Sequence, residues 1–557
     1  MNESENKKPV KRMDHQYKHL AKNTLFSISI SYGTNIFTLL TSFLIARMIS
    51  REDWAIIIVV ISIVGIFSII INFLPPGLIY SMIFYIPQYK AKNESLKLRN
   101  FVLKAFYLRT IVIFVIYFIA ITIFNIFASA YDVFLENHIA ILYILSPLII
   151  ISNFDAFFDT FLIGFNLFRT KFILFIIRSV TKILPLLVYF FLFNTIDIET
   201  IALINFLSSI GPFILGFLIF ITKIPKIKSK EEDGLNYKKF IKKVIGYGSF
   251  LRIEGLMSKI WGEAQIQAIK VFESSNWVTG TNISKHYTNS STLFLNSLNN
   301  PLIYSLSSLD YKENHDKIAK MFKIIFNYTL FVFLFITGLL FFISDFFLSF
   351  IYGETYVEYS LLIKIMLVSL VFNIYPSLFI LLLRTTNRIK LIAGITSIFF
   401  PLHIVSVLFG LINYGIYGMY IAMIIFNVIM LICDLILTIK LLKIRLGFYK
   451  MIFQYLSFFI AMFIPVILGN LIFDDLSYQF WMNSNLSIFK YLNLLNLLIY
   501  VIIFLLLNIT FKIFTKSDLD YIEMLFTKDR LSHKYVNKLL RFLKRFLRRE
   551  AELSSKN

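Results

Sequence analysis

The chain has 557 residues, of which 58% are apolar, and its mean hydropathy of +0.74 is above that of ordinary soluble domains. Its formal charge of +22 would suggest nucleic acid binding in a soluble protein, but here the cations lie between long apolar segments. The single cysteine, Cys433, excludes an intrachain disulfide and a thiolate metal cluster. The composition therefore indicates a membrane protein and argues against a nucleic acid partner.

Apolar runs of about twenty residues recur along the chain, and each is long enough to cross a hydrocarbon core of about 30 Å as a helix. The first run begins at Thr24 and is too long for a cleavable signal, so we expect it to be a retained helix. The Pro75–Gly77 break should end or kink the second helix. We predict about fourteen spans, at residues 24–46, 54–74, 105–128, 139–163, 172–194, 199–222, 244–272, 277–306, 321–344, 359–383, 389–411, 416–440, 452–473 and 491–511.

These spans predict an all-α polytopic membrane protein built from two six-helix lobes and two C-terminal helices. Arg47 precedes Trp54 by seven residues across a polar turn, and Lys270 precedes Trp277 in the same way, which favours duplicated lobes. The predicted segments are a basic arm at 1–23, a first lobe at 24–222, a linker at 223–243, a second lobe at 244–443, two further helices at 444–512 and a basic tail at 513–557.

Basic residues concentrate in alternate loops, whereas the loops between them are mainly acidic. By the positive-inside rule this pattern places both termini in the cytosol of a multi-pass cell-membrane protein. In the tail, apolar and basic residues recur at helical spacing between Lys534 and Arg548. Such a helix is expected to lie on the inner leaflet, held by the anionic headgroups of membrane lipids.

The seventh predicted span is unusually polar. A charge at mid-bilayer costs at least about 2.5–3.5 kcal/mol, so its side chains must meet water or partners. Glu263 can neutralise Lys259 at i,i+4, which leaves the stripe net positive. The polar residues that fall within an arc of about 60–80° are Arg252, Lys259, Glu263, Gln267 and Lys270.

The eighth span has a second polar face, with spacings of three and four residues. Two neighbouring polar helices favour the wall of a hydrated cavity, and the alternative is a buried polar network between helices. The residues of this face are Asn282, Lys285, Asn289, Thr292, Asn296 and Asn299.

The fourth and fifth spans carry another charged group. Folding this hairpin about Phe168 places Asp159 near Arg178 and Asp155 near Lys182 in depth. Mutual pairing would give the group a packing role; otherwise Arg178 or Lys182 faces the cavity. Three isolated titratable residues in other spans, Lys364, His403 and Asp434, are either structural or couple a proton or sodium ion.

No enzyme motif is present in the sequence. It has no P-loop, nucleophile elbow, dinucleotide fingerprint or metal-spaced His/Cys set. We therefore expect neither an enzyme nor a cofactor or metal, and any driving force would be an ion gradient, Na⁺ or H⁺, or substrate supply and consumption.

Several stretches resemble the oligosaccharide flippases of the multidrug/oligosaccharidyl-lipid/polysaccharide exporter superfamily. The resemblance implies two six-helix lobes in a V around a central cavity, a lipid-linked oligosaccharide substrate and alternating access. Family members often have Asp where this chain has Glu263. The stretches that carry the resemblance are AKNT at 21–24, IARMIS at 45–50, IYGETY at 351–356 and NYGIYGMYIA at 413–422.

A polyprenyl-linked sugar phosphate or pyrophosphate would fit the charge pattern, because its anionic head needs a wet, cationic path while its apolar tail stays in lipid. Arginine suits bidentate phosphate binding and lysine provides a point charge. The candidate phosphate contacts are Arg47, Arg252, Lys259, Lys270 and Lys285, and the candidate sugar contacts are Asn282, Asn289, Asn296 and Asn299. Such a flippase would serve polysaccharide or surface-glycan synthesis beside the glycosyltransferases of its pathway.

Two other functions compete with this prediction. A cation-coupled drug antiporter of the same superfamily would favour a carboxylate in the first helix, but residues 24–46 contain no acid. A membrane glycosyltransferase or polymerase would carry a sizeable outer loop with catalytic residues. The longest predicted outer segment, residues 474–490, is short for that role.

Overall fold

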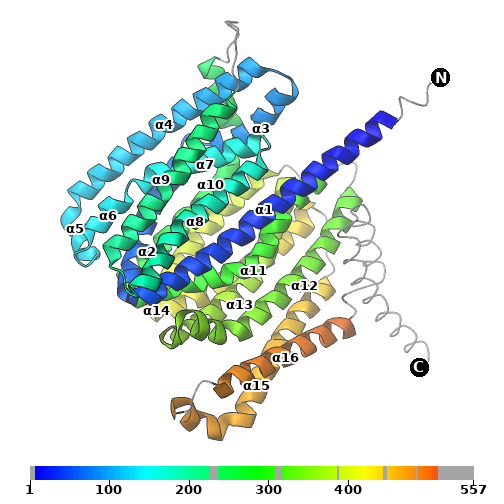
Figure 1. The fold of residues 1–557 in the computed structure, drawn as a ribbon. Coiled ribbons are helices and arrows are strands. Elements are labelled where there is room, and N and C mark those ends of the chain that lie inside the picture. The colour runs from blue at the N-terminus through cyan, green and yellow to red at the C-terminus, as the bar shows by residue number, and fades with distance from the viewer. Residues whose placement is uncertain are drawn as a thin grey trace. The chain divides into compact units, whose positions relative to one another are not determined.

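The structure, a computed structural model, describes residues 7–224, 236–307, 315–385, 388–442, 448–483, 487–511 and 513 (Figure 1). Within these ranges the chain is helical and contains no β-strand, which confirms the predicted all-α fold. Only the backbone is described at several helical positions, among them Arg252, Asn296 and Asn299. Residues 225–235 of the predicted linker and almost all of the predicted tail lie outside the described residues.

Ten segments of the described chain are long and apolar enough to cross a membrane. One of them, Gly394–Lys440, consists of two helices that meet at Gly415, where φ of 68° and ψ of −162° interrupt the helix. A shorter apolar helix covers Leu495–Thr510. The helices at Tyr237–Phe272 and Ser275–Ser307, which contain the predicted spans 244–272 and 277–306, fall outside this group because their charged and amide side chains lower the hydropathy. The chain is a multi-pass helical membrane protein, and the total of fourteen spans stays a prediction.

The chain divides into two compact units. Unit 1 comprises Met1–Tyr304, Leu348–Ser369 and Leu383–Val428, and unit 2 comprises Ser305–Phe347, Leu370–Leu382 and Ile429–Asn557. The elements of unit 1 are α1 (Lys7–Met48), α2 (Arg51–Phe73), α3 (Leu78–Ala91), α4 (Ser95–Ile126), α5 (Ala128–Phe134), α6 (Ile139–Leu145), α7 (Leu148–Gly164), α8 (Phe168–Leu192), α9 (Ile198–Lys223), α10 (Tyr237–Phe272), most of α11 (Ser275–Ser307), a π-helical turn η1 (Leu348–Tyr352) and a 3₁₀ turn η2 (Glu354–Tyr359). Unit 2 contains α12 (His315–Phe347), α15 (Phe448–Asn483) and α16 (Ser487–Thr510), while α13 (Ser360–Thr385) and α14 (Ile389–Leu442) contribute to both units.

Capping side chains fix where two of the helices begin. Ser50 precedes α2 and accepts a hydrogen bond from the Asp53 backbone N–H at 3.1 Å. Asp197 precedes α9 and accepts from the Thr200 N–H at 3.1 Å, and hydrogen bonds from Thr200 lower the pKa of this carboxyl. Each cap satisfies an N–H group that has no partner within its helix. The Ser50 cap makes the α1–α2 turn short and places Arg51 at its start.

The predicted break after α2 is confirmed and is followed by the extra helix α3, which the sequence pattern did not predict. Gly77 immediately precedes α3 and has a φ of 88°, a conformation that favours glycine. The Arg109 side chain of α4 is 1% exposed and donates to the Leu74 carbonyl at 3.4 Å and to Asn153 Oδ1 at 2.9 Å. Because prolines provide no N–H donors at this break, the guanidinium supplies donors to carbonyls that end α2.

Close helix contacts define the packing of unit 1. Helix α1 lies alongside α8, and α10 packs on α2 and α3 (Figure 1). A Cβ added to Gly33 of α1 would come within 2.8 Å of the Phe175 ring of α8, so glycine permits this approach. Phe220 of α9 packs against Phe106 and Phe161, with ring centroids 4.9 and 5.0 Å away. These aromatic contacts join α4, α7 and α9.

Unit 2 is held together by aromatic packing between α12, α15 and α16. The Tyr500 ring of α16 lies over Gly338 of α12, and its hydroxyl donates to the Leu334 carbonyl at 2.9 Å. Tyr500 also packs against Phe342 and Phe458, with centroids 5.6 and 6.4 Å apart. A residue larger than glycine at position 338 would therefore collide with the Tyr500 ring.

Candidate functional site

A group of titratable side chains joins α8, α10 and α11 of unit 1. Lys182 belongs to α8, Glu263 to α10, and Lys285 and His286 to α11, and all four are half-buried. Lys285 interacts electrostatically with Glu263, and both lysines interact with His286. The Lys285 ammonium also donates to the Gly262 carbonyl at 3.5 Å. These four residues are referred to below as the charged cluster.

The charged cluster has more positive than negative charge. Two lysines face one carboxylate, so the formal balance is +1 while His286 is neutral. The predicted pairing of Lys259 with Glu263 is wrong, because Lys259 is exposed and Glu263 interacts with Lys285 across the helix pair instead. Tertiary contact thus overrides the i,i+4 spacing that suggested the pair.

The polar face of α10 is partly covered by α2. A Cβ added to Gly65 would lie 3.0 Å from the Glu263 carboxyl carbon, so glycine leaves room for that carboxylate. Gln267 lies one turn after Glu263 on α10, and its Nε2 donates to the Val59 carbonyl at 3.1 Å and to the Ser62 hydroxyl, both on α2. Gln267 therefore belongs to a polar contact between helices, the alternative that the sequence left open.

An amide side chain connects α1 to α11. Asn35 Nδ2 of α1 donates to Ser290 Oγ of α11 at 3.0 Å. On α11, Asn282 is half-buried and Asn289 is exposed. Side chains of α1, α8 and α10 thus each interact with a polar residue of α11, namely Ser290, His286 and Lys285 in that order.

Arg178 and Lys182, one helical turn apart on α8, have different environments. Arg178 forms ion pairs with Asp155 and Asp159 of α7, each at 3.0 Å, and Lys171 approaches Asp159 at 3.9 Å. Two cations and two carboxylates balance in this network. The predicted contact of Asp155 with Lys182 is wrong, because Arg178 takes both carboxylates. Lys182 faces His286 of α11 instead.

Two other predicted phosphate contacts lie in the last turns of their helices. Arg47 lies in the last turn of α1, is exposed, and donates to the Ile351 and Phe350 carbonyls of η1 at 3.3 and 3.4 Å. Lys270, near the end of α10, pairs with Glu136 and donates to Ser275 Oγ at 2.8 Å. Both cations already have partners in this conformation.

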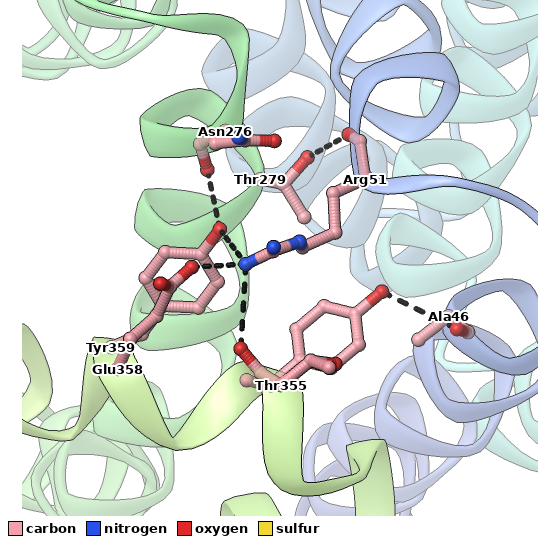
Figure 2. Close-up of polar contacts among 8 residues, drawn as sticks. Ala46, Arg51, Asn276, Thr279, Thr355, Glu358 and Tyr359 are labelled. Carbon is pink, nitrogen blue, oxygen red and sulfur yellow. Dashed lines mark hydrogen bonds and ion pairs between the residues drawn. The ribbon is translucent and has the colours of Figure 1, made fainter.

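A second polar group, absent from the predicted site, surrounds Arg51 at the start of α2 (Figure 2). Its guanidinium donates to the Thr355 carbonyl at 3.3 Å and pairs with Glu358. The Tyr359 hydroxyl donates to the Asn276 carbonyl at 2.9 Å, and Thr279 Oγ1 donates to the Arg51 carbonyl at 2.7 Å. The Arg51 cluster, defined by Arg51, Asn276, Thr279, Thr355, Glu358 and Tyr359, links α2, α11 and η2.

The two tryptophans of the proposed internal repeat border this cluster. Trp54 stacks on Tyr352 with centroids 6.3 Å apart, and Trp277 meets Tyr359 edge-on at 5.7 Å. A Cβ added to Gly280 would lie 2.5 Å from the Tyr359 ring, which shows how closely α11 approaches η2. The stretch at 351–356 that carries the family resemblance thus belongs to the contact region of both predicted lobes.

The structure places Lys182, Glu263 and Lys285 together, whereas Arg178, Arg47 and Lys270 lie in separate contacts. Neither His286 nor Gly65 was predicted, because a single histidine or glycine in a helix gives no signal of its own. The local charge pattern could not reveal the partners of the Arg51 guanidinium either, because they belong to a segment more than 300 residues further along the chain. In the described part of the chain, no three His, Cys, Asp or Glu residues are grouped as a metal site requires.

Residues 20–300, just over half of the chain, match the family model described as "Polysaccharide biosynthesis protein". No curated protein matches the sequence significantly. The comparison with solved structures shows the fold.

Three solved transporters are similar to this chain. An inward-facing multidrug resistance MATE family transporter of the MOP superfamily has 13% identity and a TM-score of 0.58, covering 75% of this chain and 99% of its own. The lipid II flippase MurJ, in an inward closed conformation, has 17% identity and a TM-score of 0.58, covering 88% and 98%. The D35N mutant of the Vibrio cholerae MATE transporter VcmN has 12% identity and a TM-score of 0.51, covering 77% and 98%.

Proposed function

The chain belongs to the polysaccharide biosynthesis protein family, and we propose that it flips a lipid-linked oligosaccharide from the inner to the outer leaflet of the cell membrane by alternating access. The inferred cargo is a sugar on a polyprenyl phosphate or pyrophosphate. One protein of similar fold is named as a lipid II flippase, which supports this class of cargo. The activity is transport, and no step of it requires a covalent change in the cargo.

The excess of cations in the charged cluster is the observation that carries the proposal. Lys182 lies within the apolar segment Phe168–Leu192 and Lys285 near the middle of α11. Among the described residues, neither lysine forms a direct ion pair, and Glu263 is the one carboxylate of the cluster. A charged side chain without a countercharge inside the membrane costs several kcal/mol. Binding of an anionic ligand beside the lysines would lower this cost for the lysines and for the ligand.

The remaining polar residues fit the other parts of this cargo. Asn282 and Asn289 present amide groups on the same helix as Lys285, and amides donate to and accept from sugar hydroxyls. Arg252, Asn296 and Asn299 stay candidates by sequence position, since their side chains are outside the described structure. The polyprenyl tail needs no protein site, because it is as apolar as the lipid around it.

Charged residues at the helix ends suggest a second role for charge in this transporter, which is to hold these ends together. They are Arg47, Lys270 and the Arg51 cluster. By the positive-inside rule, the turns that carry these residues face outward and both termini face the cytosol. We infer that Arg51, Glu358 and Tyr359 hold the outer ends of α2, α11 and η2 together while the charged cluster loads from inside. These contacts would separate when the site opens outward, which alternating access requires.

A flipping assay in liposomes tests the proposal. The probe is a short polyprenyl diphosphate carrying a fluorescent hexose, and dithionite quenches it in the outer leaflet. Liposomes with the wild-type protein should lose almost all fluorescence, whereas empty liposomes and those with Lys182→Gln/Lys285→Gln should lose only the outer-leaflet half. The site assignment fails if the double variant flips at the wild-type rate.

The same liposomes test the alternative function, a cation-coupled drug antiporter. MATE transporters share this fold, so uptake of a fluorescent organic cation by the wild-type protein, without probe flipping, would favour the antiporter. The net positive charged cluster argues against that outcome, because it would repel a cationic drug. Coupling to Na⁺ or H⁺ and association with glycosyltransferases of the same pathway stay predictions.

A further inference from the structure

We propose that a group of aromatic residues at the predicted outer end of unit 1 forms a subsite for the sugar residues of the cargo. The inference rests on the proposed flipping function and deepens it, because it separates the site for the sugars from the site for the phosphate. All residues of this group belong to unit 1. The group, called the aromatic cluster below, consists of Trp54, Trp277, Tyr352, Tyr356, Tyr359 and Tyr417.

Ring contacts connect the aromatic cluster from one end to the other. Trp54 of α2 contacts Tyr352 and Tyr356, with ring centroids 6.3 and 6.5 Å away. Tyr356 contacts Tyr359 at 6.1 Å, and Tyr359 contacts Trp277 of α11 at 5.7 Å. Trp277 in turn meets a tyrosine ring of α14 at 5.4 Å. One continuous row of rings thus joins elements that are far apart in the sequence.

Hydrogen-bonding side chains lie beside these rings. The Arg51 guanidinium lies over the Tyr356 ring, 5.9 Å from its centroid, and pairs with Glu358. Asn276 Oδ1 is buried and accepts no hydrogen bond within the described part of the chain. Figure 2 shows these three side chains around Tyr359. A buried acceptor without a donor costs free energy, and a hydroxyl group of a ligand would recover it.

This combination of side chains suits a sugar ring. A hexopyranose has faces made of C–H groups and edges that carry hydroxyls. Its faces can pack on aromatic rings, while its hydroxyls donate to and accept from charged and amide side chains. Arg51 and Glu358 cancel in charge, so the Arg51 cluster is neutral and suits an uncharged sugar better than a phosphate. The charged cluster, with its excess of lysine, has the opposite preference.

Helix α11 connects the two sites. Trp277 lies in its first turn and Lys285 follows eight residues later, which is a distance of about 12 Å along the helix axis. With the phosphate beside Lys285, the first sugar residue lies near the charged cluster. Later residues of a sugar chain that extends outward would reach the aromatic cluster. The subsite therefore predicts that transport depends on the number of sugar residues.

The aromatic cluster is closed in this conformation. Trp54, Tyr352, Tyr356 and Tyr359 are at most 4% exposed, and the other two rings are half-buried. A sugar can therefore reach these faces only when α11 and η2 move apart. Separated rings would expose apolar area to water, and the C–H faces of a sugar would cover it. Sugar binding would thus stabilise the conformation that is open to the outside.

The flipping assay with two probes tests the subsite. One probe is the polyprenyl diphosphate with a single fluorescent glucose, and the other carries a linear glucose tetrasaccharide with the same fluorophore. The measured quantity is the ratio of the tetrasaccharide rate to the monosaccharide rate. Trp277→Leu should lower this ratio several-fold, whereas Trp277→Phe, which keeps a ring, should retain it. Tyr107→Leu, which removes a 62% exposed ring of α4, is the matched control and should leave the ratio unchanged.

The outcomes separate this proposal from the proposed function. If the wild type flips neither probe, the flipping function is refuted. If the wild type flips only the monosaccharide probe, or if Trp277→Leu leaves the ratio of the two rates unchanged, the aromatic cluster is not a sugar subsite.

A labelling experiment tests the subsite with all six rings in place. Thr279 of α11 is fully buried, so a cysteine at this position reacts with an impermeant thiol reagent only when the outer end opens. In a Cys433→Ser/Thr279→Cys variant, free glucose tetrasaccharide added outside should speed this reaction several-fold. Glycerol at the same mass concentration is the control for solvent effects. Equal reaction rates with the tetrasaccharide and with glycerol would overturn the proposal, even where Trp277→Leu fails to fold.

Discussion

The Glu263 carboxylate of α10 lies against Gly65 of α2, where an added Cβ would meet its carboxyl carbon at 3.0 Å and its oxygens at 3.2 and 3.3 Å. This contact positions the only carboxylate of the charged cluster beside the helix that Gln267 also binds. Because Glu263 interacts with Lys285, a side chain at position 65 that displaces the carboxylate would weaken this interaction.

Enlarging residue 65 should change transport through Glu263. Gly65→Ala requires a shift of a few tenths of an ångström and should reduce flipping modestly, whereas Gly65→Leu should displace the carboxylate and abolish it. The measurement is the initial rate of probe flipping, with protein amount normalised by size-exclusion chromatography. Gly211→Ala is the matched control, because an added Cβ there meets nothing within 4 Å. Normal flipping by Gly65→Leu would show that the position of Glu263 is unimportant.

Neutralising the lysines should weaken cargo binding in proportion to the lost charge. A hydrogen bond to a charged group contributes about 1.5–3 kcal/mol, so Lys285→Gln or Lys182→Gln should lower probe affinity about ten- to a hundredfold. Lys285→Arg should retain more affinity than Lys285→Gln, since it keeps the positive charge. Binding is measured by fluorescence anisotropy of the probe in detergent. The exposed Lys259 serves as control, and an equal loss in Lys259→Gln would argue that only net charge matters.

Arg178 should matter for stability more than for cargo. Removing it leaves Asp155 and Asp159 together without their shared partner, which should cost about 3 kcal/mol, because breaking one side of a buried ion pair exposes the full desolvation penalty. Thermal unfolding in detergent should show a lower midpoint for Arg178→Leu and little change for Lys182→Gln. In an Asp155→Asn/Asp159→Asn background, Arg178→Leu should cost much less. Equal effects in both backgrounds would contradict the network.

The Arg51–Glu358 pair should bias the outer end of unit 1 towards closure. The two side chains are 29% and 53% exposed, so their interaction contributes at most about 1 kcal/mol, or a population change of about fivefold. In a Cys433→Ser background, a cysteine at the buried Thr279 should react faster with an impermeant thiol reagent when Glu358→Gln is present. Glu354→Gln is the matched control, and unchanged reactivity in Glu358→Gln would exclude a role in closure.

The Glu136–Lys270 pair should stabilise the folded protein by a small amount that is lost in acid. A hydrogen bond from Lys270 lowers the pKa of the Glu136 carboxyl below its unfolded value of about 4.3. Stabilisation is therefore present above that unfolded pKa and is lost as the pH falls through the folded pKa. Because Glu136 is half exposed, the effect should stay below about 1 kcal/mol. The unfolding midpoints of wild type and Glu136→Gln should differ near neutral pH and converge in acid; a difference that persists in acid would contradict this origin.

The sequence determined the class of the protein and the location of its polar helices. Runs of apolar residues predicted the helical spans, since only helices satisfy their backbone within lipid, and the break at Pro75–Gly77 followed from the chemistry of proline. The charged and amide side chains of the predicted spans 244–272 and 277–306 indicated polar helices, and because charge is costly at mid-bilayer they also indicated water or partners nearby. Local composition and spacing sufficed for each of these predictions.

Only the tertiary structure decided which charges are paired. Spacing along one helix suggested Lys259 for Glu263, and a folded hairpin suggested Lys182 for Asp155, yet Glu263 interacts electrostatically with Lys285, and Arg178 forms the ion pair with Asp155. The Arg51–Glu358 pair joins residues 307 positions apart. Pairing depends on the rotation and depth of helices against one another, which packing contacts such as Gly65 with Glu263 set, and no local pattern in the sequence encodes that geometry.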